Sequence, residues 1–367
     1  MPIASRQSCP AAASACRIWS SVPNVGAEQH EVLGVSKGDA PFGSATRLLM
    51  TTKQTCLLTL LLVLVSAATA GAQELEPRRW THLPINSNIH GIGYAYADGD
   101  LSFDPVLQID DATVNIHTVA MRYVRSFDLL GFSARIDLAG AYQDGTWKGK
   151  IAGEPAQVSR EGWVDPMVRF AVNLYGAPPL EGKAYAEYRA AQKTETIVGV
   201  GLVAQFPLGE YFDEKLINLG NNRYSFRPQF GVVHNRGKWG FELTASTWFF
   251  TDNDDFFGGL KREQKPFYTI QGHAEYHILP RLWISSGLAF GIGQESTVDG
   301  DHKDDRKENL IYAASIGYAV TRNFGLKLGY LGTTALADTG IDFDSVIVGA
   351  TFIWPDRWLR SSLGLGE

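Results

Sequence analysis

The sequence predicts an all-β protein, a transmembrane antiparallel up-and-down β-barrel of about 12 strands. Segments of roughly ten to fourteen residues between Trp80 and Trp354 alternate apolar and polar side chains, so each would have one face for lipid and one for water. The connectors are alternately long and short, as in a barrel whose two chain ends lie on one side of the membrane. Beyond the first quarter, no stretch approaches the ~18 consecutive apolar residues that a membrane helix needs.

The composition is that of a folded chain. Its 367 residues are 45% hydrophobic and 20% charged, with a net charge of -6. There is no basic stripe and no aromatic RNA-binding motif, so nucleic acid is not expected as a partner.

An export signal lies inside the chain. Met50 is followed by Lys53, an apolar run at 57–68 and small residues up to Ala72, which is the layout of a secretory signal peptide. We expect cleavage near Ala72 and delivery to the bacterial outer membrane. The predicted organisation is a non-native N-terminal extension from an over-extended start at 1–49, a signal peptide at 50–72 and an outer-membrane β-barrel at 73–367.

The first 72 residues also allow another interpretation and contain all of the cysteines. The alternative for 1–49 is a genuine cytosolic extension. All three cysteines, Cys9, Cys16 and Cys56, precede the predicted cleavage, so the mature chain has neither disulfide nor thiol chemistry.

Side-chain parity predicts the strands. In one of them Val168, Phe170 and Val172 would face lipid, while Arg169 and Asn173 would face the lumen. A soluble sandwich or lipocalin-like barrel would also alternate, but the export signal and the aromatic residues on one parity favour the membrane barrel. The expected strands are 88–97, 114–127, 130–142, 162–175, 196–207, 224–234, 239–250, 266–278, 282–292, 308–320, 324–331 and 345–354.

One connector departs from the alternation of long and short links. The link 176–195 should be a short inner turn, but it carries apolar and aromatic residues at helical spacing, among them Leu180, Ala184, Tyr185 and Tyr188. The sequence therefore predicts a short helix there, lying in the periplasm or inserted into the lumen.

The polar parity predicts a lumen of mixed charge. Such a lining suits a small-solute pathway without strong ion selectivity. Alternatively, the charges pair with one another and plug a narrow interior. The predicted lumen-lining residues are Arg135, Asp137, Arg169, Asn173, Arg227, Gln229, Glu242, Trp248, Gln271, His273 and Glu275.

Two groups of residues invite a metal interpretation. His273, Glu275 and His277 share one strand face and offer two imidazoles and a carboxylate, although a polar lumen wall explains them without a metal. Asp252, Asn253, Asp254 and Asp255 crowd oxygen atoms onto an expected extracellular loop, where a solvated acidic loop is the simpler interpretation. We expect no metal, no cofactor and no catalytic residues.

Several motifs resemble a known family. They are the stretch 163–166 (WVDP), the stretch 173–178 (NLYGAP) and the block 249–259 (FFTDNDDFFGG). Together they resemble the "putative MetA-pathway of phenol degradation" proteins. That resemblance implies an outer-membrane β-barrel transporter with a link to phenol-like compounds, and it brings no catalytic residues with it.

The expected function is therefore passive uptake of small aromatic or hydrophobic compounds by an outer-membrane channel, which is not an enzyme. The alternatives are a structural or adhesive barrel with a closed lumen, and a barrel lipid-modifying enzyme. Expected partners are outer-membrane lipid and lipopolysaccharide, a small apolar or aromatic solute and the outer-membrane assembly machinery.

The predicted assembly signal is Val348, Phe352 and Trp354. Barrel chains of this kind usually finish on an aromatic residue, whereas here a tail follows at 355–367. Deleting the tail is expected to leave assembly intact.

Overall fold

The computed structural model describes residues 75–102, 109–151, 153–337 and 340–356. The predicted extension at 1–49 and the predicted signal peptide at 50–72 lie outside these residues. Among the residues described, no helix is long and apolar enough to cross a bilayer.

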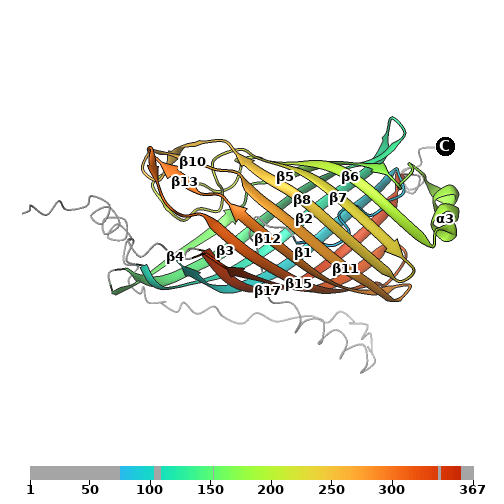
Figure 1. Ribbon diagram of the computed structural model, residues 1–367. Helices are drawn as coiled ribbons and strands as arrows, with labels where there is room; N and C mark the ends of the chain where they lie inside the picture. Colours follow the sequence, from blue (N-terminus) through green and yellow to red (C-terminus); the bar gives the residue numbers. More distant parts are fainter. Residues whose placement is uncertain (1–74, 103–108, 152, 338–339, 357–367) are drawn as a thin grey trace, which may run out of the picture. The chain divides into compact units, whose positions relative to one another are not determined.

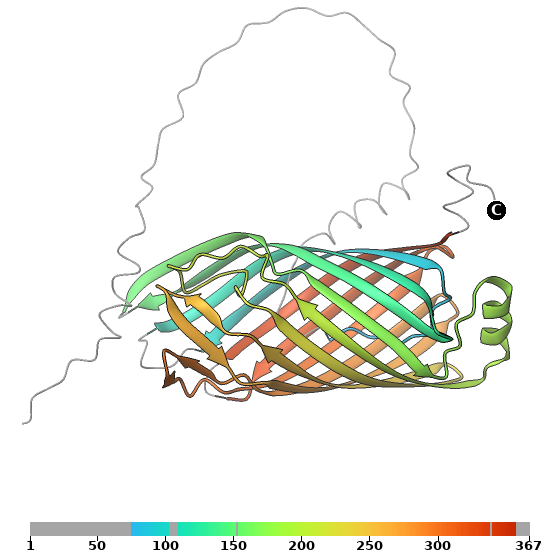
Figure 2. The same ribbon diagram turned by 90° about the horizontal axis from the view of Figure 1, so that it is seen from above.

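Twelve antiparallel strands close into a barrel, which confirms the predicted fold class (Figures 1 and 2). Each strand pairs with its neighbours in the chain, and the first strand pairs with the last along the register from Ser87↔Pro355 to Ser102↔Gly340. The barrel strands are β1 (Ser87–Ser102), β2 (Ile109–Leu129), β3 (Phe132–Ile151), β5 (Met167–Tyr175), β6 (Thr194–Gln205), β7 (Ser225–Arg236), β8 (Trp239–Phe250), β11 (Phe267–Leu279), β12 (Leu282–Gly293), β15 (Lys307–Ala319), β16 (Phe324–Ala335) and β17 (Gly340–Pro355).

The two ends of the barrel differ (Figure 1). At one end, called the inner end here, the turns are tight, as where Leu130 and Gly131 adopt positive φ between β2 and β3. At the other, the outer end, the connectors form a second, four-stranded sheet. Its strands are β9 (Asn253–Phe256), β10 (Leu260–Gln264), β13 (Ser296–Val298) and β14 (Asp301–His302).

The predicted strand at 162–175 is wrong at its start. Its first two residues end β4 (Glu154–Trp163), which forms a hairpin with the outer part of β3, and β5 begins only at Met167. Pro166 lies in the gap and has no N–H to donate to a ladder, which explains the break. The predicted strands 88–97, 114–127 and 130–142 are too short at the outer end, because β1 runs to Ser102, β2 begins at Ile109 and β3 runs to Ile151.

The connector at 176–195 contains the predicted helix, α3 (Gly182–Ala191). It lies at the inner end (Figure 1). None of its residues is buried, so the lumen-inserted alternative is wrong. The hydroxyls of Tyr185 and Tyr188 donate to the backbone oxygens of His82 and Gly176. The helix is therefore fastened to the inner end of the barrel.

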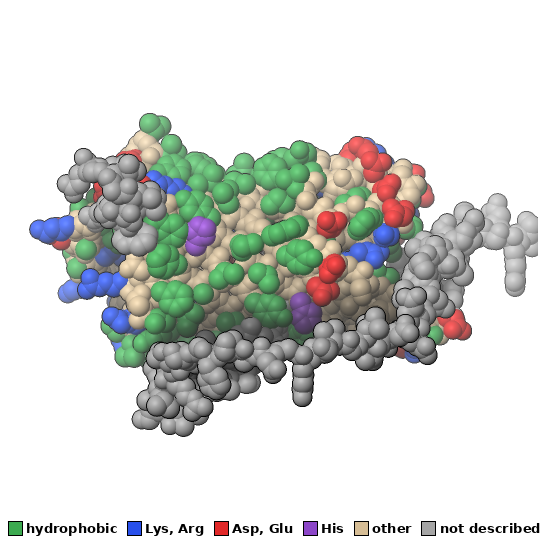
Figure 3. Space-filling view, turned by 180° about the vertical axis from the view of Figure 1, so that it is seen from behind, with side chains coloured by type: hydrophobic (Ala, Val, Ile, Leu, Met, Phe, Trp, Pro, Cys, Tyr) green, Lys and Arg blue, Asp and Glu red, His purple; other side chains and the backbone are tan. Residues whose placement is uncertain are grey.

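The outward face of the barrel is apolar. Exposed fractions reach 60% for Leu288, 52% for Leu243 and 49% for Ile270 on neighbouring strands, which suits a surface in contact with lipid. On the face in Figure 3, hydrophobic side chains cover the middle of the wall, while charged side chains gather toward its two ends.

The lumen contains a stretch of the chain that precedes β1. Residues 75–86, called the inner segment here, run inside the barrel. Trp80 is only 1% exposed, and Leu75 only 6%. Strand periodicity does not predict this segment, which determines the geometry of the interior.

Candidate lumen site

Side chains of the barrel wall hold the inner segment in place. The Arg78 guanidinium donates to both carboxylate oxygens of Glu275 over 2.5 and 2.6 Å. Trp80 Nε1 donates to Thr244 Oγ1 over 2.9 Å, and His82 Nε2 lies 2.7 Å from the backbone oxygen of Pro178. The contacts reach from the middle of the lumen to its inner end.

Glycines on the lumen face make room for Trp80. A Cβ atom built on Gly231 would lie 2.0 Å from Trp80 Nε1, and one on Gly199 would lie 2.5 Å from Trp80 Cε3. Ile197 and Val233 pack with the indole ring, and the Arg169 guanidinium carbon lies 4.6 Å from its centroid. The wall is therefore shaped around this one ring.

A charge network surrounds the inner segment. Asp137 accepts from Arg122 over 2.7 Å and from Arg169 over 3.2 Å, and its other carboxylate oxygen lies 3.4 Å from Arg135 Nε. Arg122 also forms an ion pair with Glu76 of the inner segment. The paired charges that the sequence suggested therefore exist, and the chain's own N-terminal segment completes them.

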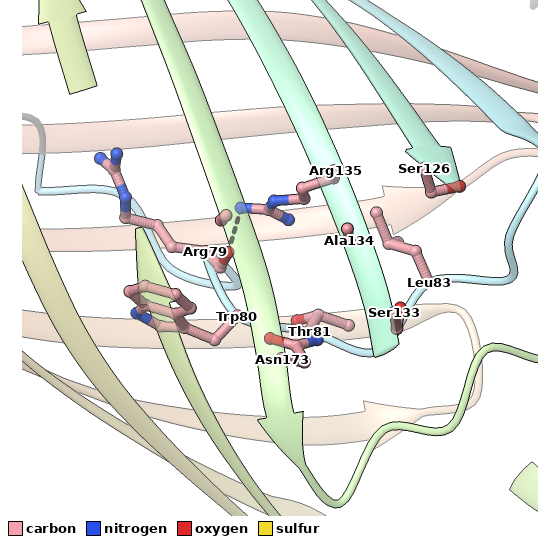
Figure 4. A pocket seen from close by; sticks show the side chains of 10 residues that line it. Arg79, Trp80, Thr81, Leu83, Ser126, Ser133, Ala134, Arg135 and Asn173 are labelled. Carbon is pink, nitrogen blue, oxygen red and sulfur yellow. Dashed lines mark hydrogen bonds between the residues drawn. The ribbon is translucent and has the colours of Figure 1, made fainter. Parts of the chain in front are cut away.

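A small cavity lies beside Trp80 in the inner segment (Figure 4). Its volume is about 10 Å³, which is room for about one water molecule. In Figure 4, Arg135 points toward the backbone of the inner segment, where it donates to the backbone oxygen of Arg79. The residues lining the cavity are Arg79, Trp80, Thr81, Leu83, Ser126, Ser133, Ala134, Arg135, Ala171 and Asn173. A solute taking this route would have to displace the inner segment.

Closer to the outer end, arginine side chains lie against aromatic rings. Arg227 donates to Ser246 Oγ over 2.9 Å, and its guanidinium carbon lies 5.3 Å from the centroid of Trp248. Thr269 and Gln271 accept longer hydrogen bonds from the same guanidinium. This layer combines rings with hydrogen-bonding groups, as a site for a small polar aromatic molecule would.

All eleven predicted lumen residues belong to barrel strands. Eight of them are less than 9% exposed, namely Asp137, Arg169, Arg227, Gln229, Glu242, Trp248, Gln271 and His273. Arg135, Asn173 and Glu275 are half-buried. Their role in transport stays a prediction.

The side chains of His273, Glu275 and His277 already contact other parts of the protein. Glu275 is held by Arg78 and lies 2.7 Å from His277 Nε2, while Gly287 packs on the His273 ring. Within the described residues, no three potential metal ligands lie together.

The predicted extracellular loop motif holds the outer connectors together. Asn253 is 3% exposed; its Nδ2 donates to Tyr211 Oη and to the Asn221 backbone oxygen, and its Oδ1 accepts from Asn222 Nδ2. Asp252 pairs with Lys261 at 2.7 Å. Two of the motif's oxygen-bearing side chains therefore already have protein partners.

Asp165, from the WVDP stretch, fastens the same outer connector. It is 3% exposed and accepts from the backbone N–H groups of Gly209 and Asn221 over 3.0 and 2.8 Å. Two of the motifs that carried the resemblance thus act on one loop.

Sequence reasoning missed the inner segment because it has no strand period. One available signal was the cluster Arg78, Arg79, Trp80 and His82, an unusual composition between an export signal and the first strand. Another was the set of glycines on the polar parity of neighbouring strands, which gives space to a bulky side chain.

The fold and lumen define an outer-membrane-type β-barrel. The sequence of residues 97–341 matches the family described as "Putative MetA-pathway of phenol degradation", and the chain belongs to that family. The search of curated proteins found no match.

Comparison with solved structures gives a match above a TM-score of 0.5 and weaker ones below it. The COG4313 outer membrane channel from Pseudomonas putida F1 is 20% identical, with a TM-score of 0.65, and the match covers 77% of this chain and 100% of that one. The transport unit of the autotransporter AIDA-I from Escherichia coli is 10% identical, with a TM-score of 0.44, and the match covers 76% of this chain and 92% of that one. The CymD monoaromatic hydrocarbon channel is 6% identical, with a TM-score of 0.37, covering 74% and 89%.

Proposed function

We propose that the protein is a passive outer-membrane channel for small aromatic or hydrophobic compounds. The observation that supports this proposal is that arginine side chains lie against tryptophan rings at several depths of the lumen. Examples are Arg78 at 4.4 Å from Trp283, Arg169 at 4.6 Å from Trp80, and Arg227 beside Trp248. Such pairs offer stacking surfaces and polar contacts together, which suits brief binding of an aromatic solute. Membership of a phenol-degradation family supports the same solute class.

Export and assembly form part of the proposal. A signal peptide at 50–72 would direct the chain across the inner membrane and be cleaved near Ala72. The assembly machinery would recognise Val348, Phe352 and Trp354 on β17. Outer-membrane lipid and lipopolysaccharide would surround the apolar wall.

The test is uptake by intact cells, whose lipopolysaccharide surface is the barrier to apolar solutes. Radiolabelled phenol, toluene and an alkane would be supplied to cells with the gene, without it and with it restored. Slower phenol or toluene uptake in the deletion strain alone is expected. Unchanged uptake of every compound would contradict the proposal.

A sealed structural or adhesive barrel is the second candidate, and the filled lumen beside Trp80 favours it. Recordings in planar bilayers separate the two, because a sealed barrel carries no current. A silent barrel with lipid turnover would indicate the lipid-modifying alternative.

A further inference from the structure

Three cations gather at the outer end of the lumen. Arg223 lies two residues before the start of β7, Arg262 belongs to β10, and Lys307 is the first residue of β15. The charge of Arg262 acts on Arg223, and the charges of both arginines act on Lys307, so the three groups lie near one another. These three residues are called the outer cationic cluster.

The strand register explains how they meet. Lys307 pairs with Gly293 at the outer end of β12, and Gln264 on β10 pairs with Ser296 just beyond it. Arg223 donates to Gln264 Oε1. The small outer sheet thereby brings Arg262 over the mouth of the barrel.

The cluster has little counter-charge. None of the ion pairs within the described ranges includes Arg223, Arg262 or Lys307. Asp305 attracts Arg262 and Lys307, but its oxygens already accept from the backbone N–H and the hydroxyl of Ser296 over 2.6 and 2.5 Å. The carboxylate that acts on Arg262 and Lys307 is therefore already engaged in hydrogen bonds with Ser296.

The two carboxylates whose charges act on Arg223, Asp165 and Asp252, also have other partners. Asp165 holds the backbone N–H groups of Gly209 and Asn221, and Asp252 pairs with Lys261. Burial lowers the pKa of Arg223 to about 9, and the charge of Arg262 lowers it further. Arg223 is nevertheless a cation at neutral pH.

Several buried donors at and below the cluster have no protein acceptor. Arg223 is only 5% exposed, and its Nε and Nη1 atoms have no hydrogen-bond partner among the described residues. The same holds for Trp248 Nε1 and for the side-chain amide nitrogens of Gln271 and Gln229, residues that are 3–4% exposed. All of these atoms are N–H donors, so the partner they suit is an acceptor.

Aromatic rings accompany the donors. The Arg223 guanidinium carbon lies 4.5 Å from the centroid of Phe250, and that of Arg262 lies 4.9 Å from the centroid of Phe256. Phe250 packs against a buried cluster that contains Trp248, and Trp248 lies two residues before Phe250 on β8. The cationic donors lie at the outer end of the lumen, and the aromatic rings lie next to them and deeper in the lumen. This arrangement suits a molecule with a carboxylate at one end and an aromatic ring at the other.

We propose that the outer lumen is a binding site for aromatic carboxylates. The carboxylate contacts Arg223, Arg262 and Lys307, and the ring lies along Phe250 and Trp248. The inference rests on the proposed function and narrows its solute class from aromatic compounds in general to aromatic acids.

The test is equilibrium binding of radiolabelled benzoate to the purified full chain at pH 7, with neutral benzamide as the matched competitor. Arg223→Gln and Lys307→Gln remove single cations of the cluster. Arg306→Gln is the control, because it removes the neighbouring charge, whose side chain is 58% exposed and pairs with Glu308. Heat-modifiable migration on a cold gel checks that each variant is folded.

Benzoate is expected to bind about tenfold more tightly than benzamide, the factor that charge-assisted hydrogen bonds supply. Arg223→Gln and Lys307→Gln should each weaken benzoate binding by about tenfold and leave benzamide binding unchanged. The control variant Arg306→Gln should bind benzoate like the wild type. Equal affinity for benzoate and benzamide would overturn the inference, and so would an Arg223→Gln variant that binds benzoate normally. Phenol uptake by cells tests the channel separately, so either proposal can fail alone.

Discussion

At the scale of single residues, Trp80 organises the lumen. Its ring occupies space that exists because Gly199 and Gly231 have no side chains, and its indole nitrogen is bonded to Thr244. A side chain larger than hydrogen on either glycine must displace the ring, because the neighbouring strands are fixed by their ladders.

Gly231→Ala is therefore expected to unseat the inner segment. The new Cβ would overlap the indole ring at 2.0 Å, at a cost of about 1–3 kcal/mol, the usual range for overpacking. A higher single-channel conductance than that of the wild type would report the displacement.

Gly272→Ala is the matched control, because its Cβ would meet nothing closer than 3.8 Å. In the double variant Trp80→Ala with Gly231→Ala, the glycine substitution should add little to the effect of Trp80→Ala alone, since the clash has been removed. Additive effects would show that Gly231 acts in some other way.

At the scale of elements, the outer connectors are built around buried polar side chains. Asn253 joins the loop before β7 to the loop after β8, and Asp165 joins the β4–β5 break to the loop after β6. These bonds hold the small outer sheet over the mouth, where Arg223 meets Gln264.

Asn253→Ala is expected to loosen this connector by about 2 kcal/mol, because several buried groups lose their partner together. Proteinase K should then cut the loop about thirtyfold faster in intact cells, since cleavage follows the population of the opened form. Asp254→Ala, at an exposed position of the same loop, should behave like the wild type. Equal cleavage of both variants would contradict the proposal that the hydrogen bonds of Asn253 hold this connector in place.

Strand parity predicted the barrel elements well because lipid on one side and a polar lumen on the other impose a period of two. It placed β8 at its observed bounds and put Arg169 and Asp137 on the inward face. It failed at Pro166, where one apparent strand is two, and in the outer connectors, where pairing continues beyond the lipid-facing region. There the stabilising contacts are long-range polar bonds such as those of Asn253, which leave no local period.

At the scale of the whole molecule, the inner segment occupies the passage. It cannot be predicted from periodicity because each of its contacts, such as Arg78 with Glu275, joins residues distant in the sequence. The interior of a barrel of about 12 strands is narrow, so one extended segment is enough to fill much of it.

Deleting residues 75–82 is expected to raise single-channel conductance severalfold, because Trp80 and the Arg78–Glu275 contact are removed together. The twelve-stranded wall should persist, as judged by heat-modifiable migration. A deletion variant that conducts like the wild type would show that the segment does not restrict the passage.

The C-terminal tail gives another prediction for the whole barrel. Truncation after Trp354 is expected to leave a heat-modifiable barrel that melts at a lower temperature than a chain truncated after Asp356. The carboxylate of Asp356 pairs with Arg125 and accepts from Asn88 over 2.8 Å, which ties β17 to the first two strands. Loss of the folded form after truncation at Trp354 would contradict the assignment of Val348, Phe352 and Trp354 as the assembly signal.

The pairing of β1 with β17 also sets an order in time. From Ser87 to Ser102, one edge of the first strand keeps its backbone N–H and C=O groups without their final partners until the last strand has been synthesised and exported. Lipid offers those groups no hydrogen bonds, so an incomplete sheet is costly to insert. The free edge of β1 must therefore be kept out of the bilayer until β17 arrives to pair with it.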